Sequence, residues 1–91
     1  MLALSRKQTL SRLAGLEESV LWHLNEHVPA TMRNVPSAVP HWRREVGAIL
    51  NDMERLAGNA NLGKKTSQEW QAKIAQLRGR LATLLGEDAH E

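Results

Sequence analysis

Two apolar runs with the same spacing constrain the fold of this chain more than any other feature. Large apolar residues recur at steps of 4, 3, 4 and 3 from residue 42 to 56, and again from residue 70 to 84. Such steps place side chains on one face of an α-helix, so both segments are predicted to be helices with a narrow apolar seam. The first run is Trp42, Val46, Ile49, Met53 and Leu56, and the second is Trp70, Ile74, Leu77, Leu81 and Leu84.

The two predicted helices are expected to form an antiparallel hairpin. The turn-rich segment 58–66 between them is short, and helices joined by a short loop pack as antiparallel neighbours. Trp42 should therefore lie near Leu84. Trp70 should lie near Leu56, at the other end of the seam. Each member of the second run follows its counterpart by 28 residues, which either a duplication or the shared heptad pattern of helical bundles explains.

The segment before the hairpin predicts a further helix. Ser5 and Gln8 have the spacing of a capping box, and apolar residues then recur at helical spacing as far as Pro29. Glu17 falls at the centre of this apolar stripe, where an unpaired acid would be costly to bury. Three alternatives stay open for it: packing at the two ends of the helix only, a cation from a partner, or a cation from this chain. The candidate cations of this chain are Arg43, Arg44 and Arg78.

Prolines and caps set the predicted boundaries. Three prolines in residues 28–40 each favour extended backbone in the preceding residue, so this segment is predicted to be a connector. Thr66 and Glu69 form a second potential capping box, ahead of the last helix. Gly58 is well suited to end the middle helix. The predicted elements are helices at about 5–28, 41–57 and 67–85, a connector at 28–40 and a loop at 58–66.

Composition favours a small all-α fold. The chain has 91 residues, 42% of them hydrophobic, and its aromatic content of 3% consists entirely of Trp. A core of Leu, Ala, Val, Ile and Met suits helix packing better than sheet pairing. We therefore predict one helical domain over residues 1–91, a three-helix bundle in which the first helix is laid across the hairpin. A homodimer that pairs two hairpins into a four-helix core is the alternative.

Charge and targeting signals exclude several classes of protein. There is no Cys, so disulfides and thiolate metal sites are excluded. The apolar stretch at the start is too short for a secretory signal, and no run approaches a membrane span, so a cytoplasmic location is expected. The net charge of +2 is too small to imply a polyanionic partner by itself.

The pentapeptide HLNEH at residues 23–27 has the spacing His-x-x-Glu-His of one class of zinc peptidases. On a helix it places His23, His27 and the potential base Glu26 close together. A catalytic zinc site needs a third protein ligand, and His41 is the only other histidine placed to supply one. The alternative, which we favour, is that both histidines are partly covered residues at the edge of the core. No catalytic, metal-binding or cofactor-binding residue is predicted.

Two surfaces are left over after this core is built. Trp22 lies about opposite the apolar stripe of its helix, close to Glu18 and Glu26. Three alternatives stay open: the connector covers the ring through Pro29, Val35 or Pro36, the ring anchors a partner, or it is exposed without a role. The second surface is a seam of small residues, which is an ordinary exposed face or a packing site for the first helix or another protomer. This seam consists of Ala72, Ala75, Gly79, Ala82 and Gly86.

These surfaces favour a non-enzymatic protein-interaction module, such as an inhibitor, an antitoxin-like protein or an adaptor, which presents a helix face to a larger protein. In this interpretation the predicted partner-binding residues are Trp22, Glu18, Glu26, Ala72, Ala75, Gly79 and Ala82. Homodimerisation is possible, and no cofactor, membrane or nucleic acid is expected. The alternative is a dimeric regulator that binds nucleic acid through the basic start of its first helix, at Arg6, Lys7 and Arg12.

Overall fold

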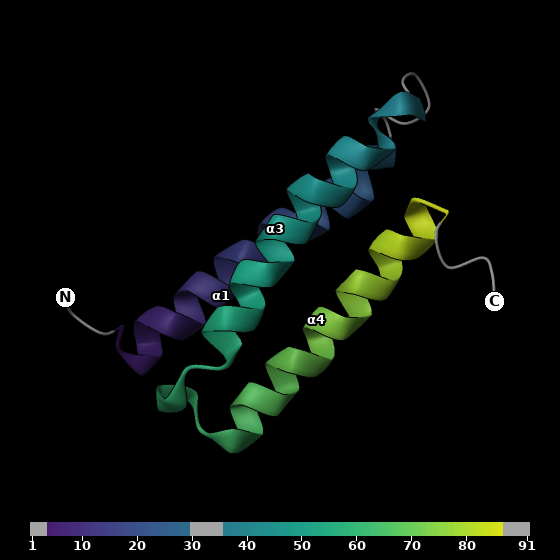
Figure 1. The fold of residues 1–91 in the computed structure, drawn as a ribbon. Helices are drawn as coiled ribbons and strands as arrows, with labels where there is room; N and C mark the ends of the chain where they lie inside the picture. The colour runs from purple at the N-terminus through teal and green to yellow at the C-terminus, as the bar shows by residue number, and fades with distance from the viewer. Residues whose placement is uncertain (1–3, 30–35, 87–91) are drawn as a thin grey trace.

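The computed structural model describes residues 4–29 and 36–86. Within these ranges the chain forms three α-helices and no strand (Figure 1), which confirms the predicted all-α bundle. No helix in the described ranges is long and apolar enough to cross a membrane. The elements are α1 (Arg6–Trp22), the π-helical turn η1 (His23–His27), the 3-10 turn η2 (Pro36–Ala38), α3 (Val39–Ala57), the 3-10 turn η3 (Ala60–Leu62) and α4 (Lys64–Leu84).

The helix α3 lies between the other two helices and packs against both. It runs antiparallel to α4, as predicted, and antiparallel to α1 (Figure 1). Polar contacts between the first and last thirds of the chain join residues 55 or 56 positions apart, which shows that α1 and α4 run in parallel. These contacts are Arg6–Leu62, Glu17–Lys73 and Asn25–Arg80. The first helix therefore lies along the hairpin, and the expectation that it lies across the hairpin is wrong.

The start of α1 has the predicted capping box. The Ser5 hydroxyl accepts a hydrogen bond from the Gln8 N–H at 3.1 Å, and the Gln8 side chain accepts from the Ser5 N–H at 2.9 Å. These two bonds satisfy donors that have no partner within a helix. The polar residue Thr9 follows in a fully buried position, where its hydroxyl donates to the Ser5 carbonyl at 3.0 Å.

The helix α3 begins at Val39, two residues before the predicted start. Pro40 belongs to its first turn rather than to the connector. Proline is compatible with that position, since the first N–H groups of a helix have no intrahelical acceptor and the fixed φ of proline is already helical. Of the predicted connector, residues 30–35 lie outside the described residues.

The predicted capping box at Thr66 and Glu69 is wrong. The helix α4 begins three residues earlier than expected, at Lys64, after Gly63 with a φ of 81°. The Thr66 hydroxyl instead accepts a hydrogen bond from the Arg6 guanidinium at 3.2 Å. Gly58 directly follows the last residue of α3, as predicted, but its φ of −82° is not the left-handed conformation in which glycine commonly ends a helix. A glycine with positive φ does follow the end of α4, at Gly86, where φ is 77°.

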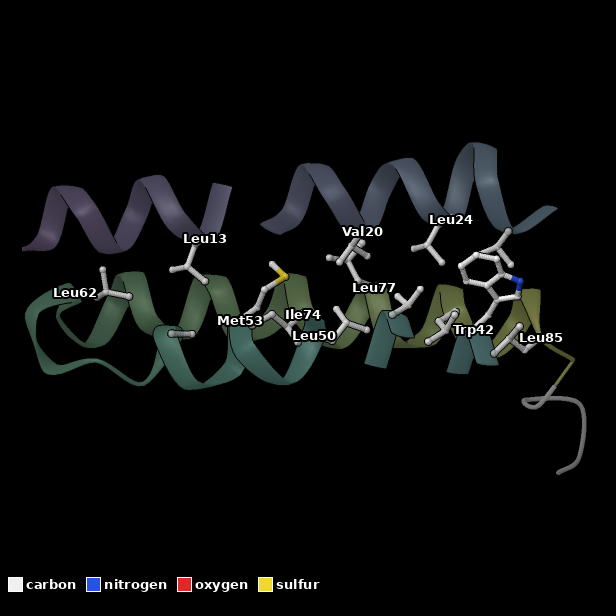
Figure 2. Close-up of a cluster of buried hydrophobic side chains, with 14 residues drawn as sticks. Leu13, Val20, Leu24, Trp42, Leu50, Met53, Leu62, Ile74, Leu77 and Leu85 are labelled. Carbon is white, nitrogen blue, oxygen red and sulfur yellow. The ribbon is translucent and has the colours of Figure 1, made fainter. Parts of the chain in front are cut away.

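The core is wider than the predicted seam (Figure 2). In α3 the fully buried positions include Leu50 and Ala57, whereas Ile49 and Leu56 are only partly buried. The reason is that α3 has a neighbour on each side, so its buried face extends beyond a single heptad seam. The buried apolar residues are Leu13, Val20, Leu24, Val28, Trp42, Val46, Leu50, Met53, Ala57, Leu62, Ile74, Leu77, Leu81 and Leu85.

The two tryptophans of the hairpin lie near its opposite ends, as predicted. Trp42 is buried and lies at the same end of the core as Leu85 (Figure 2), one residue beyond the expected neighbour Leu84. Trp70 is half-buried against the core, and the Lys73 ammonium lies 4.5 Å from the centre of its ring. A Lys so placed shields part of the indole from water while its own charge stays hydrated.

Candidate functional site

The HLNEH motif forms one turn of π-helix, η1, at the end of α1. The Val28 N–H donates to the carbonyl of His23, five residues back. A π-turn holds more residues than an α-helical turn, and such turns often occur at functional sites. It brings the imidazoles of His23 and His27 onto one side of the helix, where their ring centroids are 5.6 Å apart.

Five rings gather around this turn, and we call Trp22, His23, His27, His41 and Trp42 the ring cluster. The His27 ring lies between two indoles, since its centroid is 4.6 Å from that of Trp22 and 4.6 Å from that of Trp42. His23 contacts the edge of Trp22 at 5.1 Å, and His41 packs on Trp42 at 4.7 Å. The cluster therefore extends from the core, at Trp42, to the surface, at Trp22.

The imidazoles of the cluster contact the indoles edge-on or at a tilt, with interplanar angles of 47° to 84°. The Nδ1 atom of His23 lies 2.8 Å from the Ser19 carbonyl, and Nδ1 of His27 is buried with no hydrogen-bond partner among the described residues. Within residues 4–29 and 36–86, no three His, Asp or Glu side chains are grouped so that they could hold a metal ion. Both His23 and His27 are half-buried, which confirms that they lie at the edge of the core.

Trp22 is the only large apolar side chain that is exposed in the described part of the chain, with 52% of its surface accessible. The rings of His23 and His27 contact it from the same helix. We predicted that Val35 or Pro36 of the connector could cover this ring. Val35 lies outside the described residues, and so does the side chain of Pro36. Glu18 and Glu26, four residues to either side, are exposed as well. The structure thus leaves an indole with two carboxylates on its helix face.

A groove runs between η1 and α4, on a different side of α1 from Trp22. Its volume is about 550 Å³, and it is lined by Leu24, Gly79, Arg80, Thr83 and Leu84. Two leucines make the lining largely apolar. The Arg80 guanidinium donates to the side-chain oxygen of Asn25, which holds one positive charge at the edge of the groove. A site of this size and character suits an apolar side chain of a partner.

The small residues of α4 face outward. Ala72, Ala75 and Gly79 are exposed and Ala82 is half-buried, so the alternative in which α1 packs on this seam is wrong. A Cβ atom added to Gly79 would meet nothing within 4 Å among the described residues. Of the five residues of the predicted seam, only Gly79 lines the groove.

Glu17 has a partner in this chain, but not one of the three arginines that the sequence suggested. Its carboxylate lies 3.5 Å from the ammonium of Lys73 on α4, and its side chain is 26% exposed. Arg78 instead pairs with Glu54 across the hairpin, at 3.0 Å. Lys73 is the partner because α1 lies parallel to α4, an arrangement that periodicity alone does not predict.

The basic start of α1 is divided between two roles. The Arg6 guanidinium donates to the carbonyls of Asn61 and Leu62, and so holds the loop between α3 and α4. Lys7 and Arg12 are exposed and line a second, more polar groove of about 390 Å³. Of the three cations predicted to bind nucleic acid, Arg6 is therefore engaged in hydrogen bonds within the fold. Nucleic-acid binding stays a prediction.

Sequence reasoning found Gly79 but missed the other residues of the η1–α4 groove. Leu24 had been predicted only as part of the apolar stripe, and Arg80, Thr83 and Leu84 come from a helix more than 50 residues away. The only available signal was an interior glycine in a helix, which lowers helix stability unless something packs against it. No protein-family model matches the chain, and no curated protein or solved structure matches it either.

Proposed function

We propose that this protein is a non-enzymatic protein-interaction module, of the inhibitor, antitoxin-like or adaptor kind, and that it presents the groove face of α4 to a larger protein. The partner's side chain enters between Leu24 and Leu84, and its backbone passes over Gly79. The groove is open, largely apolar and carries one fixed cation. Its complement is an apolar anchor with a carboxylate beside it, as on an amphipathic helix.

The observation that carries this proposal is the position of Gly79. An interior glycine lowers helix stability by about 0.5–1 kcal/mol relative to alanine. The described residues offer no packing reason for it, because a Cβ would meet nothing within 4 Å. Gly15 and Gly47 are equally bare, but Gly79 is the one that lines the groove between two leucines. A close approach by another molecule gives the missing side chain a physical reason.

The test is to immobilise three forms of the protein and to compare which proteins each form retains from the same cell extract. The three forms are the native chain, Gly79→Leu and Ala48→Leu. Leu at position 79 fills the groove, while Ala48 is an exposed residue of α3 outside it and controls for the added apolar surface. We expect a set of proteins that the native chain and Ala48→Leu retain and that Gly79→Leu loses. Retention of the same proteins by all three forms would contradict the proposed use of the groove.

A further inference from the structure

The outward side of α1 is a second surface, which no other element within residues 4–29 and 36–86 covers. Six exposed residues at helical spacing form it, opposite the buried residues Thr9, Leu13 and Val20. We call these six the outer face of α1. They are Lys7, Ser11, Ala14, Gly15, Glu18 and Trp22. The surface is distinct from the groove of α4, whose contribution from this end of the chain is Leu24.

The ends of this face carry opposite charges. Lys7 lies at its start with Arg12 beside it, whereas Glu18 and the nearby Glu26 lie toward its end. Both bases and both acids are exposed. The face is therefore complementary in charge to a reversed copy of itself. A parallel copy would instead bring like charges together.

The positions of the residues also match under reversal. If two copies of α1 cross with a two-fold axis between Ala14 and Gly15, Lys7 of one copy lies opposite Trp22 of the other, and Ser11 lies opposite Glu18. The smallest residues then meet at the crossing, where close approach of two helices needs them. A Cβ at Gly15 would meet nothing within 4 Å among the described residues, so the single chain supplies no contact there.

We propose that the outer face of α1 binds a second copy of this chain in an antiparallel, two-fold symmetric dimer. Each exposed indole lies against the aliphatic stem and ammonium of the other copy's Lys7, a favourable cation–π arrangement. Lys7 and Arg12 flank Glu18 of the second copy. This inference goes beyond the proposed function and is independent of it, since the groove of α4 is not used. A single helix pair is a small interface, so the dimer is weak.

Charge reversal in two separate chains tests the pairing by sedimentation equilibrium. The variant Lys7→Glu/Arg12→Glu has acids at both ends of the face, and Glu18→Lys/Glu26→Lys has bases at both ends. We expect the native chain to dimerise, each variant alone to dimerise at least tenfold more weakly, and an equimolar mixture of the two to regain dimers. Circular dichroism of each variant confirms that it is folded. A native chain that stays monomeric up to millimolar concentration, or a mixture that regains no dimer, overturns the proposal.

Cysteine cross-linking tests the location of the axis without changing a charge. The chain contains no Cys, so a single introduced thiol reports only its own surroundings. Under mild oxidation Ala14→Cys, beside the axis, is expected to form a disulfide dimer at least tenfold faster than Ala48→Cys. Ala48 is also an exposed alanine within a helix, lies outside both proposed surfaces and serves as the matched control. Equal rates for the two variants would show that α1 does not meet α1.

Discussion

His27 is the residue at which the core and the surface meet. Its imidazole lies between a buried indole and an exposed one, with ring centroids 4.6 Å away on both sides. The ring thus contributes packing, while its buried Nδ1 atom has no hydrogen-bond partner among the described residues. A buried polar atom without a partner lowers stability by about 1–3 kcal/mol, so the shape of this ring matters more to the fold than its polarity.

Substitution of His27 separates these two contributions. His27→Phe keeps a ring between the indoles and removes the unpaired nitrogen, so the free energy of unfolding should be unchanged or rise by up to about 1 kcal/mol. His27→Ala removes the ring and should lower it by about 2 kcal/mol, less than for a fully buried aromatic residue. Urea unfolding measures both. An equal loss in both variants would mean that the nitrogen has an essential partner.

Arg6 should be needed for the order of the loop that follows α3. Its guanidinium donates to the carbonyls of Asn61 and Leu62 and to the Thr66 hydroxyl. Arg6→Lys keeps the charge but loses the forked geometry, so amide hydrogens of residues 59–63 should exchange at least threefold faster. Lys7→Arg, an equally conservative change at the next residue, should leave exchange unchanged. Unchanged exchange in Arg6→Lys would assign the loop's order to other contacts.

At the scale of elements, the sequence predicted the three helices but not the residues at which α3 and α4 begin. The 4-3-4-3 runs gave α3 and α4, and the capping box at Ser5 gave the start of α1. The start of α4 was missed because Thr66 is occupied by Arg6, a residue 60 positions away. The π-turn was missed because an apolar stripe at helical spacing does not distinguish a π-turn from an α-helical one.

Glycine substitutions test whether the helix ends and interiors are as described. Gly79→Ala and Gly47→Ala should each raise the free energy of unfolding by about 0.5–1 kcal/mol, since both have room for a Cβ and alanine favours the helix. Gly63→Ala should lower it by about 1–3 kcal/mol, because the φ of 81° and ψ of 160° at Gly63 lie in a region that essentially only glycine adopts. Thermal unfolding of the three variants checks the signs. A stabilised Gly63→Ala variant would contradict the turn before α4.

For the whole molecule, the sequence predicted the hairpin, the number of helices and the exposed positions of Trp22 and of the small residues on α4, whereas it did not predict the groove between η1 and α4. The groove of α4 joins Leu24 to Gly79, and that neighbourhood exists only because α1 lies parallel to α4. The position of Trp22 on its helix marked it as unusual in the sequence. Its exposure, however, depends on which side of α1 packs against α3 and α4. The bundle is closed by the packing of α1 on α3, which leaves Trp22 outside.

The most direct test of this claim is ¹⁹F NMR of the native chain labelled with 5-fluorotryptophan, because its three Trp residues report on three depths in the fold. Each signal is assigned from one Trp→Phe variant, and the change in its shift between H₂O and D₂O measures exposure to solvent. At concentrations where the chain is monomeric, the account predicts the largest change for Trp22, an intermediate one for Trp70 and the smallest for Trp42. A Trp22 signal as insensitive to solvent as that of Trp42 would contradict it.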